Sequence, residues 1–82
     1  MRAAILVYEG TEPIDLATYG VLSMARRVAP EVSMVLVARE AGAVRLANGL
    51  VVMADHGYAD APPADVLIIT GGPGWDRASK DP

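Results

Sequence analysis

The chain has 82 residues, of which 52% are hydrophobic and 21% are charged, a balance typical of a folded globular segment rather than a disordered one. Ten acidic against seven basic side chains give a formal net charge of -3. The basic surplus that phosphate neutralisation requires is missing, so we expect no nucleic-acid partner for this segment. The absence of cysteine excludes disulfides, thiolate metal sites and thiol catalysis by these residues.

The first half of the chain predicts a strand, a helix and a second strand. Residues 3–8 form a continuous apolar run, typical of a strand covered on both faces. Residues 11–29 predict an amphipathic helix, with Pro13 in its first turn and Pro30 after its end. Residues 32–38 form another apolar run, which favours a right-handed parallel crossover. One stripe of the helix is expected to face inward: Ile14, Ala17, Val21, Ala25 and Val28, flanked by Leu22 and Met24.

The second half predicts a hairpin and a further strand. Residues 43–47 and 50–54 flank Asn48-Gly49, a dipeptide with ready access to positive φ that favours tight hairpin turns. Residues 55–65 indicate an irregular connector with room for one helical turn, and residues 66–70 predict another buried strand. The order of elements therefore predicts an α/β fold with a parallel sheet and an inserted β-hairpin.

One long helix is too little cover for three strands that are apolar on both faces. A chain of this length buries only about 60 to 65% of its unfolded surface, and the remaining apolar patches call for more protein. We therefore expect residues 1–82 to be the N-terminal part of a single larger domain, or a chain that associates as a homodimer. The apolar runs are too short to cross a membrane and no signal-peptide layout follows Met1, so we expect a cytoplasmic protein without a membrane partner.

Two loops at the carboxyl ends of predicted strands are the candidate site. In Gly71-Gly72-Pro73-Gly74, glycine permits close approach of a ligand to the backbone, and amides before a predicted helix at residues 75–80 can face an anion. The same glycines also suit an ordinary turn without a ligand. The nucleotide-binding fingerprints are not matched, because no Lys-Ser or Lys-Thr follows the glycines.

Asp15 is the candidate acid, in the first turns of the predicted helix. Glu9 and Glu12 lie close by in sequence, and carboxylates near one cleft can act as general acids or bases. An acid at a helix start is also common without any catalytic role. His56, beside Asp55, is interpreted as a loop residue, since no second histidine or cysteine is present to complete a metal site.

Taken in order, these motifs resemble the ThiJ/PfpI superfamily. The branch that the sequence is most similar to includes isocyanide hydratases and the amidotransferase-like sensor domains of AraC-type regulators. The resemblance implies a flavodoxin-like sandwich of the class I glutamine amidotransferase type. It rests on Glu9-Gly10, Pro13-Ile14-Asp15-Leu16, Ala43-Val44-Arg45, Ala47-Asn48-Gly49-Leu50, Asp55, Ala59-Asp60-Ala61-Pro62, Asp65-Val66-Leu67 and Gly71-Gly72-Pro73-Gly74.

The resemblance also implies roles for four residues. Asp15 matches the acid that faces the family's reactive cysteine, and Gly72 matches the glycine whose amide helps form the oxyanion hole. Gly71 and Gly74 would shape the loop that binds substrate. The family's cysteine lies on a strand-to-helix elbow after the glycine loop, which these 82 residues do not contain, so we expect no activity of this chain alone by the family mechanism. No cofactor is implied.

Three functions remain in competition. The first is the N-terminal part of a cysteine-dependent hydratase or hydrolase such as an isocyanide hydratase, acting on a small molecule. The second is a sensor domain that binds a small ligand and passes a signal to a downstream helix-turn-helix pair. The third is an inactive association module that only dimerises. Fold alone does not choose among them.

Overall fold

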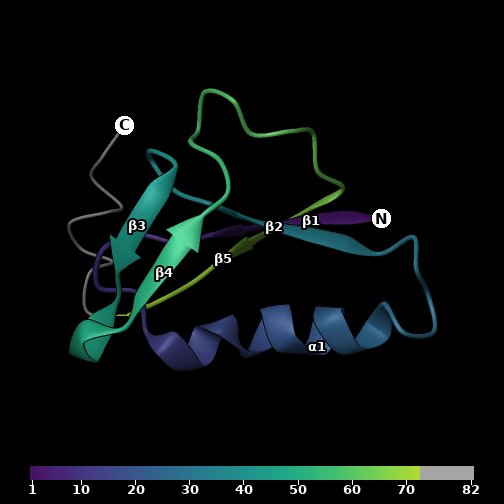
Figure 1. Ribbon diagram of the computed structural model, residues 1–82, viewed down its shortest axis with the longest axis horizontal. Helices are drawn as coiled ribbons and strands as arrows, with labels where there is room; N and C mark the ends of the chain where they lie inside the picture. Colours follow the sequence, from purple (N-terminus) through teal and green to yellow (C-terminus); the bar gives the residue numbers. More distant parts are fainter. Residues whose placement is uncertain (73–82) are drawn as a thin grey trace.

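A computed structural model describes residues 1–72 of the chain (Figure 1). Six regular elements follow one another: β1 (Arg2–Leu6), α1 (Ala17–Ala25), β2 (Ser33–Val37), β3 (Gly42–Arg45), β4 (Val51–Ala54) and β5 (Val66–Ile69). Short 3-10 turns at Pro13–Leu16 and Ala47–Gly49 precede α1 and join β3 to β4. The predicted helix at residues 75–80 lies outside the described residues.

The central layer is a three-stranded parallel sheet in the order β2-β1-β5. Ala4 of β1 is paired with Val35 of β2 on one side and with Leu67 of β5 on the other. Ile5 and Val7 are fully buried, because β1 is the middle strand and apolar on both faces. The predicted α/β class and the parallel pairing of the apolar runs are confirmed.

The predicted hairpin is confirmed, and Asn48-Gly49 makes its turn. Strands β3 and β4 pair antiparallel, and both turn residues have positive φ, 62° for Asn48 and 88° for Gly49. Asparagine and glycine are the residues that adopt this conformation at least cost. The hairpin closes one side of the core, a cluster formed by Ile5, Val7, Ala38, Val44, Leu46 and Ala54.

The helix lies where the sequence predicts it but turns its other face inward. It opens with the 3-10 turn at Pro13, and hydrogen bonds continue past α1 as far as Ala29. Ile14, Val21 and Val28 of the predicted core stripe are exposed, whereas Leu22 and Ala25 are half-buried. The prediction of an inward stripe was wrong because apolar side chains occupy both sides of this helix, and periodicity cannot then identify the buried side.

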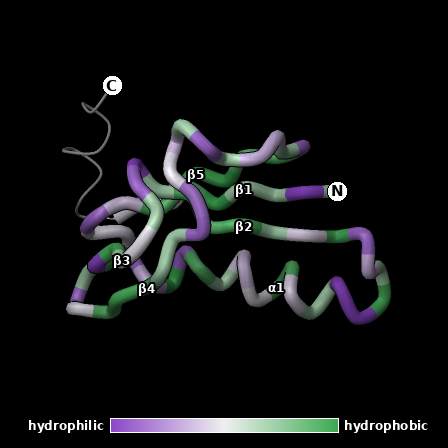
Figure 2. Tube along the Cα trace, turned by 45° about the horizontal axis from the view of Figure 1, so that its top comes forward, coloured by the Kyte–Doolittle hydropathy of each residue, from purple (hydrophilic) through white to green (hydrophobic). Residues whose placement is uncertain are grey.

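Strand β5 is less covered than the sequence predicts. Val66, Leu67 and Ile69 are all exposed, although the run was predicted to be buried. The reason is topological: β5 is hydrogen-bonded only to β1 within the described residues, and α1 packs along β2. Figure 2 shows hydrophobic colouring on all three strands, β5 included.

The connector between β4 and β5 crosses the side of the sheet opposite α1 (Figure 1). It contains no helix among residues 55–65, so the predicted helical turn is absent. Two aspartates fasten its ends through paired backbone and side-chain bonds: Asp55 with Leu36, and Asp65 with Arg2. In residues 1–72 no helix is both long enough and apolar enough to cross a membrane.

Candidate functional site

The loops that follow β1 and β5 lie against each other at the carboxyl edge of the sheet. The Gly71 N–H donates to Asp15 Oδ2 at 2.7 Å, and the Glu12 N–H donates to the Gly71 carbonyl at 2.8 Å. Parallel strands end at a common edge, so residues far apart in sequence meet there. The structure therefore brings the candidate acid and the candidate glycine loop together, with Asp15 half-buried.

A buried polar network joins the strand ends beneath the glycine loop. Thr70 Oγ1 donates to the Leu6 carbonyl at 2.8 Å, and Tyr8 Oη donates to the Thr70 carbonyl at 2.7 Å. Thr11 Oγ1 accepts the Tyr8 N–H at 2.9 Å and lies 3.2 Å from Thr70 Oγ1. Because the Thr70 proton points to Leu6, the Thr11 hydroxyl donates within the threonine pair.

Burial perturbs the tyrosine of this network. Desolvation raises the pKa of Tyr8 above its usual value, the hydrogen bond with Thr70 lowers it by a smaller amount, and the nearby charge of Asp15 raises it again. Each raising effect disfavours the phenolate. Tyr8 therefore stays protonated at neutral pH, which keeps its hydroxyl as a donor to the loop.

Gly72 occupies a position that no other residue fits. Its φ is +139°, and an added Cβ would lie 2.7 Å from the Gly10 carbonyl oxygen and closer still to the Glu12 nitrogen. At Gly71 an added Cβ would lie 3.4 Å from Asp15 Oδ2, which is an ordinary contact. The close approach of the two loops thus depends on Gly72.

The loop borders an open concavity of about 340 Å³, lined by Ile69, Thr70, Gly71 and Gly72. Within residues 1–72 the Gly72 N–H donates to no acceptor, and Asp15 Oδ1 accepts no hydrogen bond. A free amide beside a carboxylate can stabilise an anion and exchange a proton with it. Gly74, the fourth candidate, lies outside the described residues.

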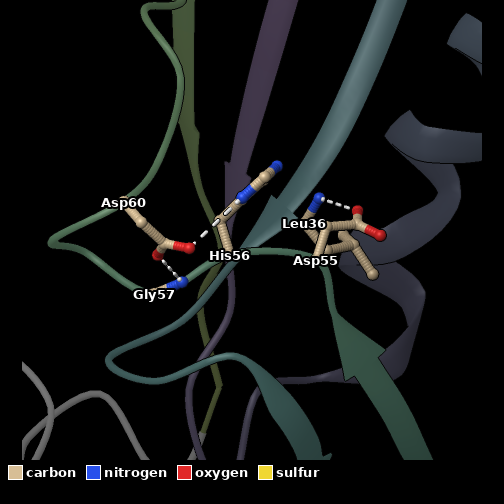
Figure 3. A network of polar contacts seen from close by, with 5 residues as sticks. All are labelled: Leu36, Asp55, His56, Gly57 and Asp60. Atoms are coloured by element: carbon tan, nitrogen blue, oxygen red, sulfur yellow. Dashed lines mark hydrogen bonds and ion pairs between the residues drawn. The ribbon is translucent and has the colours of Figure 1, made fainter.

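His56 belongs to a separate network at the far end of β4 (Figure 3). Its Nδ1 lies 3.7 Å from Asp60 Oδ2, while Asp60 Oδ1 accepts the Gly57 N–H at 2.8 Å. The His56 carbonyl accepts the Ala38 N–H, so this residue extends the pairing beyond β2. Among the described residues no three acidic, histidine or cysteine side chains gather closely enough to hold a metal ion.

Sequence reasoning missed the three residues that support the glycine loop: Tyr8, Thr11 and Thr70. The available signal was their position, since each stands at or just after the carboxyl end of an apolar run. Thr11 and Thr70 are almost fully buried, and a buried hydroxyl requires a partner. Their partners are one another, which no local pattern could have indicated.

Comparison with known proteins identifies the fold. No family model matches the sequence, and a search of curated proteins finds no match either. The DJ-1 superfamily protein Atu0886 from Agrobacterium tumefaciens is 26% identical over 99% of this chain, with a TM-score of 0.72. Drosophila melanogaster DJ-1beta is 20% identical over 94% of it, with a TM-score of 0.70. An AraC family transcriptional regulator from Pseudomonas putida is 21% identical over 98% of it, with a TM-score of 0.73.

The match covers almost all of this chain but a smaller share of each neighbour. The chain spans 43% of the Agrobacterium protein, 41% of the Drosophila protein and 56% of the Pseudomonas regulator. The shared part includes the parallel sheet, the hairpin and the loops at the sheet edge. By this fold, and by the 26% identity with a DJ-1 superfamily protein, the chain belongs to the DJ-1/ThiJ/PfpI superfamily.

Proposed function

We propose that residues 1–72 supply the acidic and anion-stabilising half of a small-molecule site in an isocyanide hydratase-like enzyme. The observation that carries the proposal is the contact between Asp15 Oδ2 and the Gly71 N–H at 2.7 Å. It holds an acid beside a glycine loop whose Gly72 amide has no acceptor within the described residues. The nucleophile comes from outside this chain, since the sequence holds no cysteine.

In this proposal Asp15 performs two tasks through its two oxygens. Oδ2 fixes the loop by accepting the Gly71 N–H, and Oδ1 is left to face a thiol brought from the rest of the domain. A carboxylate in that position takes the thiol proton and returns it to the adduct. The Gly72 amide stabilises the negative charge that develops on addition, and Gly71 and Gly74 shape the surface that receives the substrate.

The test is an activity assay on the protein purified from its source, with a small alkyl isocyanide as substrate and formamide appearance as readout. We expect Asp15→Asn to lower kcat by about 100-fold or more, as loss of a general acid–base does, while the amide oxygen still accepts the Gly71 N–H. Asp60→Asn, in the network around His56, serves as the matched control and leaves kcat unchanged. Equal activity of Asp15→Asn and the unaltered protein would contradict the proposal.

A second candidate function is ligand sensing, in which the same edge binds a small molecule without chemistry. The likeness to the Pseudomonas regulator over 98% of this chain favours it as the alternative. The two candidates require different C-terminal partners for the domain, since a sensor acts through a basic DNA-binding extension. Retention of a DNA fragment by the source protein in a gel-shift assay, without turnover of isocyanide, would favour the sensor.

A further inference from the structure

The outer face of α1 carries a regular row of apolar side chains that water contacts. Its members are spaced by three, four, three and four residues, and we call them the α1 seam: Ile14, Ala17, Val21, Met24 and Val28. The exposed fractions are 74% for Ile14, 67% for Val21, 59% for Met24 and 88% for Val28, and Ala17 is exposed as well.

This spacing is typical of a helix that packs against another helix. A mean repeat of 3.5 residues keeps apolar side chains on one line, where knobs of one helix enter holes of its partner. A helix facing only water has no reason to keep that repeat on its outer side. The seam therefore marks a surface that another helix covers.

The helix cannot bury the seam by rotating, because its opposite face is already engaged. Leu22, Ala25 and Ala29 are half-buried on the side that packs along β2. In both views α1 runs beside the sheet, and hydrophobic colouring recurs along its length (Figure 2). Cover for the seam must come from a second molecule or from another segment of protein.

Charge distribution favours a second copy of the same helix in antiparallel orientation. Glu9 and Glu12 stand before the helix, and Arg26 and Arg27 stand at its other end. Parallel pairing would place like charges together, whereas an antiparallel pair places the arginines of one copy beside the glutamates of the other. A two-fold axis near Val21 closes such a contact after two copies, which gives a dimer rather than a fibre.

We propose that α1 is a homodimerisation helix, whose seam packs antiparallel against the seam of a second copy. This inference concerns a surface apart from the glycine loop and does not rest on the proposed enzymatic function. The rival surface is the exposed face of β5, which would direct association through Leu67 and Ile69.

Sedimentation equilibrium of the 82-residue chain tests the proposal. We expect a mass of twice 8.6 kDa, and a dissociation constant raised at least 100-fold by Val21→Glu or Met24→Glu. Met53→Glu is the matched control, because Met53 is 65% exposed but lies on β4, and it should leave the dimer intact. Circular dichroism checks that each variant keeps its helix.

A charge exchange tests the orientation. Arg27→Glu and Glu12→Arg should each weaken the dimer about 10-fold, and the double variant should recover most of the lost affinity. Three outcomes would overturn the proposal: a mass of 8.6 kDa at every concentration, a dimer unaffected by Val21→Glu, or a dimer that only Leu67→Lys dissociates. Failure of the double variant to recover affinity would overturn the antiparallel arrangement.

Discussion

The carboxyl edge of the sheet and the outer face of α1 differ in how their polar and apolar groups are used. At the edge, Thr11 and Thr70 are buried and hydrogen-bonded, and the loops touch through glycine. On the outer face of α1, Val21 and Val28 stand in water. The difference teaches that local chemistry is already built within residues 1–72, whereas apolar cover is not. Substitutions at the edge should therefore act on folding, and substitutions on the outer face on association.

The largest effect on folding is expected at Gly72. Gly72→Ala forces a side chain into the Gly10 carbonyl and a φ of +139°, so we expect a loss of about 3 kcal/mol in the free energy of unfolding. Urea denaturation measures it. Gly20→Ala is the control, because an added Cβ meets nothing within 4 Å, and it should stabilise the helix by about 0.5 to 1 kcal/mol. Equal effects of the two substitutions would break the comparison.

The next effect is expected at Asp15, which holds the glycine loop. Asp15→Ala leaves the Gly71 N–H without its acceptor, so we expect a loss of about 1 to 2 kcal/mol in unfolding free energy. Asp15→Asn keeps an acceptor oxygen and should cost less than half as much. Amide hydrogen exchange gives a local readout, since Gly71 should exchange faster in the alanine variant. Unchanged exchange would mean that the carboxylate does not hold the loop.

Tyr8→Phe should cost about 1 kcal/mol, because it deletes the bond to the Thr70 carbonyl. The raised pKa of Tyr8 adds a pH dependence. Its contribution is complete below the usual tyrosine pKa of about 10 and is lost as pH rises through the higher folded-state pKa, because the unfolded chain ionises first. Urea midpoints at about pH 8 and about pH 10.5, on either side of that usual pKa, should fall further apart in the unaltered chain than in Tyr8→Phe; parallel falls would contradict this.

The smallest effect is expected in the network around His56. The ion pair with Asp60 spans 3.7 Å and its carboxylate is largely exposed, so Asp60→Asn should change the free energy of unfolding by less than about 0.5 kcal/mol. The amide oxygen still accepts the Gly57 N–H. A loss above about 1 kcal/mol in urea denaturation, beyond the usual range for an exposed pair, would show that this network holds the connector more firmly than its exposure indicates.

Elements with strong local signals could be predicted from the sequence. The apolar run that becomes β1 and the Asn48-Gly49 turn both depend on neighbouring residues. The buried side of α1 could not be predicted, because Leu22 and Val21 compete for the core and only the position of β2 decides. Asp15 was found through a motif, but its bond to Gly71 spans 56 positions and depends on strand order. Thr11 and Thr70 escaped notice for the same reason.

The most direct test of the central claim is the sequence beyond Pro82 in the protein purified from its source, determined by intact mass and peptide sequencing. The account predicts a mass well above 8.6 kDa and a cysteine on a strand-to-helix elbow after the glycine loop, placed to face Asp15. A protein of 8.6 kDa, or a longer one without a nucleophile at that elbow, would contradict the claim that Asp15 and Gly72 form half of an enzyme site.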